Sequence, residues 1–390
     1  MKLQTIGQLK KNDLAGKKVL LRLDLNVPLE KGEALAASDL WKIRSSLPTI
    51  DYLLHQGAAL IILSHLGRPD GKKIKRYSLR PVIKKLAEMI GHKITLWDYP
   101  VSGWQAKTKK LRPHEVVALE NIRFHPGEEK NDVKLSKQLA GLADLYVDDA
   151  FGNIERAHAS MLGVTKYLPS YAGFLVQKEL AELAGLLKHS KHPIVAIMGG
   201  SKISTKIGLI KHLLTKVDYL LLGGALANDV LQSKDIEVGK SLVDPNANLL
   251  NQFIMNNRLK LPVDARVGVS TGSKKYRISA IGRVRPNELI LDLGPDTVEL
   301  YSAIIRKAKT VIWNGPLGYF ENPVYAWSTK ELAKVIANSH AREYVGGGET
   351  VKAVLQNRLE DKLHFVSSGG GAMLAVLEQA PLPALRPLIR

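Results

Sequence analysis

The feature of this sequence that most constrains its fold is a series of short apolar runs in the second half, each ending at glycine. The clearest run is Ile194–Met198, which leads into Gly199 and Gly200 and then into apolar residues at helical spacing from Ile203 onward. A β-branched run, a glycine turn and a helical period predict a buried strand, a tight turn and a helix. The other runs end at Gly223-Gly224, Gly294, Gly315, Gly346-Gly347-Gly348 and Gly369-Gly370-Gly371. This alternation predicts an α/β fold with parallel sheets.

The glycine turns also predict a binding site for phosphate groups. Gly199 and Gly200 let backbone N–H groups approach an anion, and the following helix N-terminus adds partial positive charge. Lys202 and Lys206 lie one predicted helical turn apart, so both could reach one phosphate chain. The spacing differs from that of the common P-loop. Because glycines recur at so many strand ends, we expect a flat, polyanionic ligand close to the backbone, and a nucleotide fits this description.

Glu349 and Thr350 follow the glycine triplet 346–348 and open a predicted helix. This position suits a phosphate at the helix N-terminus and a carboxylate that holds Mg²⁺. A carboxylate in the first turn also stabilises a helix without any metal, so both interpretations of Glu349 stay open.

In the first half, polar and basic residues follow apolar runs at 18–25, 58–63, 116–119 and 145–147. They are Asp24 and Asn26, then His65 and Arg68, then Arg123, and finally Asp148, Asp149 and Arg156. An open parallel sheet places its ligand crevice at the carboxyl ends of its strands. Lys42 lies on a helix predicted to run from about Asp39 through Leu54. A basic pocket for a small acid that carries phosphate and carboxylate groups is predicted from Arg68, Arg123, Arg156, Lys42 and His65.

Composition limits the other possibilities. A chain of 390 residues suggests roughly two or three domains. The net charge of +19 attracts anions, although it is equally typical of a basic host proteome. The basic runs 72–76 and 107–110 lack interleaved aromatic residues, so no nucleic acid is expected as a partner. The chain has no cysteine, no signal peptide and no apolar stretch of membrane-spanning length, and we therefore expect a cytoplasmic protein without disulfides, bound to no membrane.

The motifs, taken in order, resemble the phosphoglycerate kinase family over nearly the whole chain. They are L-R-L-D-L-N-V-P, S-L-P-T-I, S-H-L-G-R-P, L-E-N-I-R-F-H, D-D-A-F-G, R-A-H-A-S, M-G-G-S-K, W-N-G-P-L-G-Y-F-E, G-G-G-E-T and S-S-G-G-G-A. The resemblance implies two Rossmann-like domains that close about a hinge, and reversible phosphoryl transfer between ATP and 3-phosphoglycerate, giving ADP and 1,3-bisphosphoglycerate, in glycolysis and gluconeogenesis. It also implies Mg²⁺ as cofactor and a monomeric enzyme.

The resemblance further implies a division of the chain. Residues 1–172 would bind 3-phosphoglycerate, 173–190 would form a hinge helix, 191–375 would bind the nucleotide, and 376–390 would return to the first domain. For the hinge, the leucine spacing of 177–188 predicts one continuous helix.

Site residues follow from the same resemblance, position by position. The acid would be bound by Asp24, Asn26, Lys42, His65, Arg68, Arg123 and Arg156. The nucleotide would be bound by Gly199, Gly200, Lys202, Lys206, Gly223, Gly224, Asn314, Pro316, Glu321, Gly346, Gly347, Gly348, Glu349 and Thr350. Glu349 would hold Mg²⁺, Glu321 would bind the ribose, and Gly223-Gly224 would lie near the base. The residues expected to act in the transfer step are Lys42, Lys202, Lys206, Gly347 and Gly370.

Some positions depart from the family pattern. Lys42 stands in place of an arginine, which predicts slower transfer because lysine lacks the planar fork. Glu349 replaces the magnesium-binding Asp. At five other positions this chain also differs from the residue usual in the family: Asp148 replaces Asn, Glu155 replaces His, Ser201 replaces Ala, Thr205 replaces Asp and Ser328 replaces Gly.

These departures leave a weakened or non-catalytic nucleotide-binding relative as the alternative. A dinucleotide-dependent dehydrogenase is a third hypothesis, which the absence of G-x-G-x-x-G after the first strand of either half disfavours.

Overall fold

The computed structural model describes residues 2–390 except 28–34, 36, 99–100, 201–205 and 246–255. The chain divides into two compact units. Unit 1 comprises Met1–Leu183 and Ala380–Arg390, and unit 2 comprises Ala184–Gln379. None of the described helices has the length and apolar character that crossing a bilayer requires.

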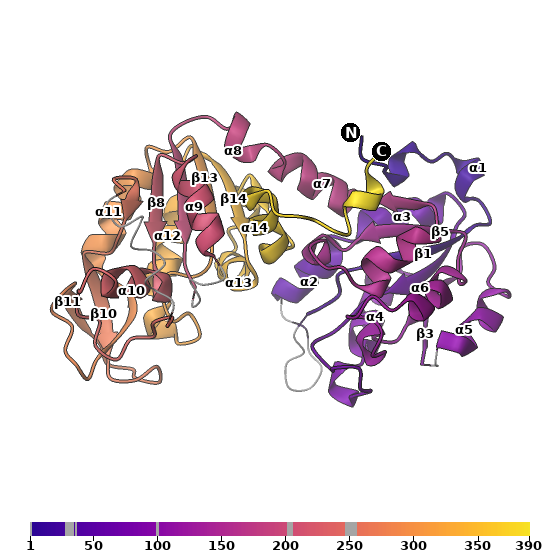
Figure 1. Ribbon diagram of the computed structural model, residues 1–390, viewed down its shortest axis with the longest axis horizontal. Helices are drawn as coiled ribbons and strands as arrows, with labels where there is room; N and C mark the ends of the chain where they lie inside the picture. The colour runs from indigo at the N-terminus through magenta and orange to yellow at the C-terminus, as the bar shows by residue number, and fades with distance from the viewer. Residues whose placement is uncertain (1, 28–34, 36, 99–100, 201–205, 246–255) are drawn as a thin grey trace. The chain divides into compact units, whose positions relative to one another are not determined.

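Unit 1 is built on a six-stranded parallel sheet of order β3-β4-β2-β1-β5-β6 (Figure 1). The strands are β1 (Lys18–Leu23), β2 (Ala59–Leu63), β3 (Ile94–Trp97), β4 (Val116–Leu119), β5 (Leu145–Asp149) and β6 (Ser170–Ala172). The helices are α1 (Lys11–Leu14), α2 (Ala37–Arg44), α3 (Leu47–His55), α4 (Arg80–Ile90), α5 (Val101–Thr108), α6 (Val133–Ala140) and α7 (Phe174–Leu183). The two ends of the chain meet in this unit, where Leu3 forms an antiparallel bridge with Ile389.

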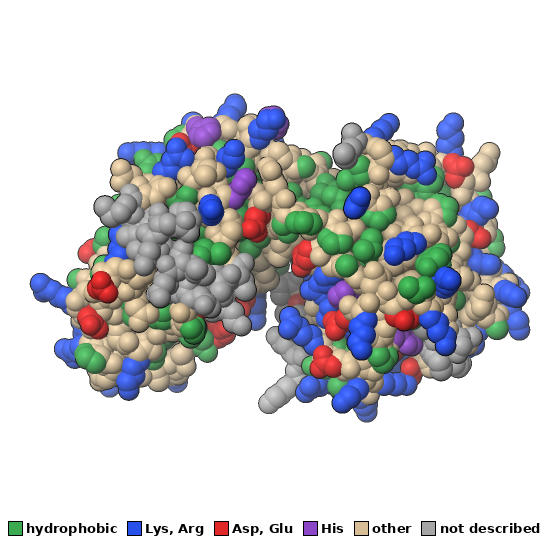
Figure 2. Space-filling model, in the orientation of Figure 1, with side chains coloured by type: hydrophobic (Ala, Val, Ile, Leu, Met, Phe, Trp, Pro, Cys, Tyr) green, Lys and Arg blue, Asp and Glu red, His purple; other side chains and the backbone are tan. Residues whose placement is uncertain are grey.

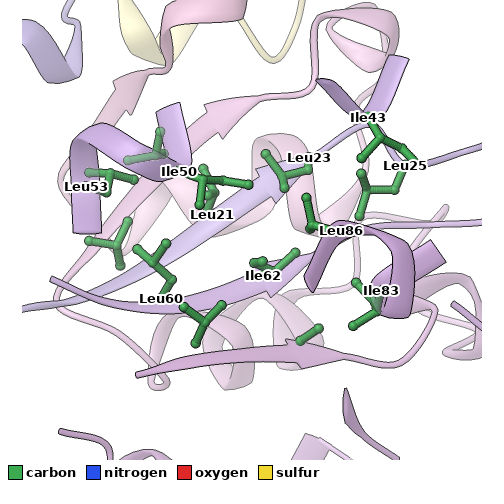
Figure 3. Packing of buried hydrophobic residues seen from close by; sticks show 14 of the residues in the cluster. Leu21, Leu23, Leu25, Ile43, Ile50, Leu53, Leu60, Ile62, Ile83 and Leu86 are labelled. Atoms are coloured by element: carbon green, nitrogen blue, oxygen red, sulfur yellow. The ribbon is translucent and has the colours of Figure 1, made fainter. Parts of the chain in front are cut away.

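Both faces of this sheet are covered, because alternate residues of each strand point to opposite sides. Leu21 and Leu23 of β1 pack with Leu60 and Ile62 of β2 against α3 and α4, through Ile50, Leu53, Ile83 and Leu86 (Figure 3). On the other face, Leu20 and Ile61 pack with Trp104 of α5 and with leucines of α6. The rigid sheet fixes the loops that leave its carboxyl edge.

Unit 2 contains a second six-stranded parallel sheet, of order β15-β14-β13-β7-β8-β9, and a three-stranded antiparallel sheet, β11-β10-β12. The parallel strands are β7 (Ile194–Met198), β8 (Tyr219–Leu222), β9 (Leu259–Lys260), β13 (Thr310–Asn314), β14 (Arg342–Gly346) and β15 (Phe365–Val366). The antiparallel strands are β10 (Asp264–Gly268), β11 (Arg277–Ala280) and β12 (Leu289–Leu293). The helices are α8 (Leu186–His189), α9 (Ile207–Leu214), α10 (Gly224–Gln232), α11 (Pro295–Ile305), α12 (Trp327–Ala337), α13 (Gly348–Gln356) and α14 (Gly370–Glu378).

The prediction of an α/β fold with parallel sheets is confirmed, and three predictions of detail are wrong. The helix expected from Asp39 through Leu54 is two helices, because Pro48 lacks the N–H that would continue α2 and instead lies at the start of α3. The helix expected over 177–188 is also divided, since Gly185 has a φ of 83° between α7 and α8. Finally, Gly294 follows β12 of the antiparallel sheet and caps α11, so it does not join the glycines of the parallel sheet.

Candidate active site

The carboxyl ends of β1 and β2 bring together the first group of predicted acid-binding residues. Nζ of Lys42, on α2, lies 2.8 Å from Oδ2 of Asp24 and also donates to the carbonyl of Asn26. Burial alone would raise the pKa of Asp24, but the charge and hydrogen bond of Lys42, with the charge of Arg22 and the N–H of Asn26, outweigh burial, so the pKa lies below its ordinary value. Oδ1 of Asn26 accepts from the N–H of Gly67, at 2.9 Å, and so ties the β1 loop to the β2 loop.

His65 follows β2 and is buried against Arg22, a residue of β1 that the sequence analysis missed. Nη2 of Arg22 lies 3.2 Å from Nδ1 of His65. Because a guanidinium can only donate, Nδ1 is the acceptor and the ring proton lies on Nε2. Nε2 has no hydrogen-bond partner among the described residues. Burial, followed by the charges of Arg22 and Arg123, holds the pKa of His65 well below its usual range, so the ring is neutral.

Arg22 anchors a buried polar network behind this loop. Its Nε donates to Oγ of Ser160 at 3.1 Å, and its Nη1 donates to the carbonyl of Leu23. Ser160 in turn donates through its N–H and its hydroxyl to Glu128, which is fully buried. An arginine inside the apolar run K-V-L-L-R-L was the one sequence signal for this network, since a charge in a strand buried on both faces needs partners.

Replacement of Arg22 by Met is expected to lower the free energy of unfolding by about 3 kcal/mol, because Ser160 loses the Arg22 donor and buried Glu128 loses the charge of Arg22, which acts on it together with His158. Thermal or urea unfolding followed by circular dichroism measures this. Arg80→Met, at the exposed start of α4, is the control and should stay within about 0.5 kcal/mol of the parent. Equal losses in the two variants would contradict a structural role for Arg22.

The loop after β4 supplies Arg123, which is nearly buried. Its Nη1 donates to the carbonyl of Gly67 at 2.8 Å, and its Nε lies 3.1 Å from Oε1 of Glu129. Asn121 shapes this loop, because its side chain donates to the carbonyls of Leu66 and Tyr77. Burial lowers the pKa of Arg123 without removing its charge.

The turn after β5 supplies Arg156, whose charge lowers the pKa values of both His65 and Arg123 and therefore lies near them. Asp148 is buried, and burial raises its pKa to about 6, with Arg22 among the groups that oppose this shift. Asp149 has a structural role: its side chain accepts hydrogen bonds from the N–H groups of Leu175 and Val176 and so caps α7.

We call Arg22, Asp24, Lys42, His65, Arg123 and Arg156 the acid-site cluster. Arg68 is exposed, and among the described residues no carboxylate lies within ion-pair distance of it.

In unit 2, the glycine turns of the parallel sheet pack directly on one another. The N–H of Gly199 donates to the carbonyl of Asn314, and that of Gly223 donates to Met198. A Cβ atom on Gly199 would overlap the carbonyl oxygen of Pro316, and one on Gly370 would overlap Cα of Gly347. These positions need glycine because backbone lies against backbone.

Lys206 points back over this turn. Its Nζ donates to the carbonyl of Gly199 at 2.7 Å. Burial lowers its pKa, and the charge of Glu349 opposes that shift. Lys206 immediately precedes α9 with a φ of −123°, so it is not a helical residue as predicted, and Lys202 lies outside the described residues, as do Ser201 and Thr205.

The loops after β13 and β14 complete this group. Nδ2 of Asn314 donates to the carbonyl of Gly346, and Oγ1 of buried Thr350 accepts from the N–H of Gly315. The predicted helix after the glycine triplet is confirmed as α13, with Gly347 as its N-cap. Burial raises the pKa of Glu349, Glu321 raises it further, and Lys206 opposes the shift. The carboxylate of Glu349 therefore interacts electrostatically with the carboxylate of Glu321 and with the ammonium of Lys206. Gly224 begins α10, and its N–H donates to Leu317.

Ser328, which stands where the family pattern has Gly, has a structural explanation. Its N–H and hydroxyl both donate to Asp292, whose pKa burial raises to about 7. Elsewhere, lysine and arginine side chains are scattered over the visible face of each unit (Figure 2).

Comparison with known proteins agrees with this architecture. Residues 9–380 match the family model described as phosphoglycerate kinase. Phosphoglycerate kinase of Roseiflexus sp. (strain RS-1) is 44% identical over 391 residues, covering 96% of this chain and 97% of the relative. That of Pelotomaculum thermopropionicum is 42% identical over 386 residues, covering 97% of each chain.

Solved structures give the same result. Phosphoglycerate kinase from Coxiella burnetii is 38% identical with a TM-score of 0.82, covering 99% of both chains. That from Pyrococcus horikoshii OT3 is 28% identical with a TM-score of 0.85, covering 99% of this chain and 98% of the other. The chain belongs to the phosphoglycerate kinase family.

Proposed function

We propose that this protein transfers a phosphoryl group reversibly between ATP and 3-phosphoglycerate, giving ADP and 1,3-bisphosphoglycerate, as in glycolysis and gluconeogenesis. The observation that carries the proposal is the pairing of two anion sites in one chain: the acid-site cluster in unit 1, and the glycine turns with Lys206 in unit 2. A reaction between two anions needs a site of this kind for each of them.

The acid-site cluster is proposed to hold the acid by charge and by directed donors. Arg123, Arg156 and Lys42 supply positive charge, with Arg68 exposed and available from the β2 loop. Neutral His65 offers its Nε2–H to an acid oxygen, because that donor has no other described partner. Asp24 and Asn26 fix the position of Lys42.

The glycine turns are proposed to hold the nucleotide. Backbone N–H groups at Gly199-Gly200, Gly346-Gly347-Gly348 and Gly370 would face its phosphates, with Asn314, Pro316 and Thr350 shaping the floor. Gly223-Gly224 would lie near the base, and exposed Glu321 would bind the ribose. Lys206 is proposed to neutralise charge on the transferring group, and we assign Lys202 the same task.

In the transfer step, a carboxylate oxygen of the acid attacks the γ-phosphorus in line, while the bond between that phosphorus and the ADP oxygen breaks. No covalent bond to the protein is needed, so the residues act by position and charge. The acid and nucleotide sites belong to different units, and closure about the segment 173–190 stays a prediction.

Glu349 is the residue proposed to hold Mg²⁺. The described residues contain no group of three or more His, Asp or Glu side chains that could hold a metal by themselves. Mg²⁺ nevertheless needs only one or two protein carboxylates when substrate phosphates supply other ligands, and exposed Glu349, whose carboxylate interacts electrostatically with that of Glu321, fits that requirement. When bound, Mg²⁺ neutralises charge on the nucleotide phosphates.

A coupled assay tests the proposal. ADP release from ATP and Mg²⁺ should require 3-phosphoglycerate and should stop when a chelator removes the metal. If purified protein binds MgATP but releases no more ADP with the acid than without it, the proposed activity is wrong.

Lys42→Arg is expected to raise kcat roughly tenfold, the effect of about 1.4 kcal/mol of added transition-state stabilisation. Lys42 makes single-point contacts with Asp24 and Asn26, whereas a guanidinium donates a planar pair of hydrogen bonds. Arg44→Lys, at an exposed position of the same helix, should leave kcat unchanged. A lower kcat in Lys42→Arg would show that this site is adapted to lysine.

A further inference from the structure

Glu155 lies beside the acid-site cluster, and its carboxylate forms no hydrogen bond to any described residue. It occupies the turn directly before Arg156, and its Oε1 is 3.9 Å from Nε of Arg156, too far for a hydrogen bond. Its Oε2 is buried and has no hydrogen-bond partner among the described residues. Burial raises the pKa of Glu155, Arg156 opposes the shift, and Asp24 adds to it, so Asp24 is also near.

The other cations of the cluster have closer partners. Lys42 lies 2.8 Å from Asp24, and Arg123 lies 3.1 Å from Glu129. Arg22 is held by Ser160 and by a backbone carbonyl. Of the ion pairs in the cluster, the one between Arg156 and Glu155 therefore has the longest separation between charged groups. The Arg156 side chain is also about one third exposed. An incoming anion therefore loses less free energy by displacing Glu155 from Arg156 than by displacing the closer partners of Lys42 or Arg123.

We propose that Glu155 sets the affinity of the acid site by competing with the anionic acid for Arg156. The proposal rests on the proposed function for the identity of the acid. A phosphate or carboxylate that pairs with Arg156 comes within a few ångströms of the Glu155 carboxylate, and like charges at that separation near a protein surface repel. Asp24 adds negative charge near Glu155, and Lys42 is already paired with Asp24, so Lys42 is not available to neutralise the Glu155 carboxylate. Glu155 thus keeps acid binding weak and reversible.

Isothermal titration calorimetry of 3-phosphoglycerate into the full-length protein tests this inference. Glu155→Gln keeps the shape of the side chain and removes its charge, so the Kd for the acid should fall about fivefold. Glu155→Asp keeps the charge and should stay close to the parent. Glu88→Gln, which neutralises an exposed carboxylate paired with Lys85 on α4, controls for the change in net charge and should have no comparable effect.

Steady-state kinetics separate this role from a structural one. In Glu155→Gln the KM for the acid should fall with the Kd, while the KM for MgATP stays unchanged, whereas a folding defect would affect both substrates. An equal Kd for the parent and Glu155→Gln, or the same gain in Glu88→Gln, would overturn the inference and leave the proposed function standing. Absence of acid binding in every one of these proteins would overturn the proposed function together with the inference.

Discussion

Lys206→Ala is expected to lower kcat about a thousandfold, with a much smaller change in the KM for MgATP. Nζ of Lys206 is held over the Gly199 turn by a 2.7 Å hydrogen bond, and its charge lies near that of Glu349. Charge on the transferring group grows in the transition state, so a fixed cation stabilises that state more than the bound nucleotide. Losing one such donor commonly costs a factor of about 10² to 10³.

The matched control for this experiment is Lys211→Ala. Lys211 is an exposed lysine on α9, the helix that Lys206 precedes, so both variants remove one positive charge from the same part of unit 2. Only Lys206→Ala should fail in the coupled assay, and both proteins should melt close to the parent temperature. A Lys206→Ala enzyme within tenfold of the parent kcat would show that Lys206 does not contact the transferring group.

The parallel strands were the most predictable part of the fold. Strands such as β4 and β7 have the predicted bounds, because a strand buried on both faces is an unbroken apolar run, and the polar or glycine residues that follow it mark its end. Strand β3, with alternating half-buried residues at the sheet edge, and the short β6 do not carry that signal and were missed. The breaks at Pro48 and Gly185 were visible as residues, but the apolar spacing continued across them and concealed them.

The sequence predicted which residues belong to the candidate site, but it did not predict which partners their side chains contact. Position after a strand identified Asp24, His65 and Arg123, since the carboxyl ends of parallel strands meet at one edge. The partners of these residues come from distant parts of the chain: Arg22 reaches Ser160, 138 positions away. No local pattern encodes such a pairing. Glu155 and Arg156 are adjacent in the sequence, but the 3.9 Å separation of their charged groups depends on how the turn after β5 is packed.

Gly199→Ala is expected to lower the melting temperature by about 10 °C and to weaken MgATP binding at least tenfold. The backbone of Gly199 does not have positive φ, so any effect of the methyl group is steric. Its Cβ would overlap the carbonyl oxygen of Pro316 and would lie 2.6 Å from the carbonyl carbon of Pro316 and 2.9 Å from the oxygen of Gly315. All of these are backbone atoms of the loop after β13, which cannot move without displacing Asn314 and its bond to Gly346. Overpacking of this kind costs about 3 kcal/mol, which corresponds to the expected shift for a unit of this size.

Gly208→Ala is the matched control, because an added Cβ there also overlaps an oxygen, Oε1 of Glu378. That atom is the end of a flexible side chain, and Gly208 is an exposed residue within α9, where alanine is the better helix former by about 1 kcal/mol. Differential scanning calorimetry should therefore find Gly208→Ala close to the parent or above it, and Gly199→Ala well below it. Equal melting temperatures for the two variants would show that the contact between the Gly199 turn and the loop after β13 is not the rigid element that holds the nucleotide site. The proposed close approach of backbone to phosphate would then lose its main support.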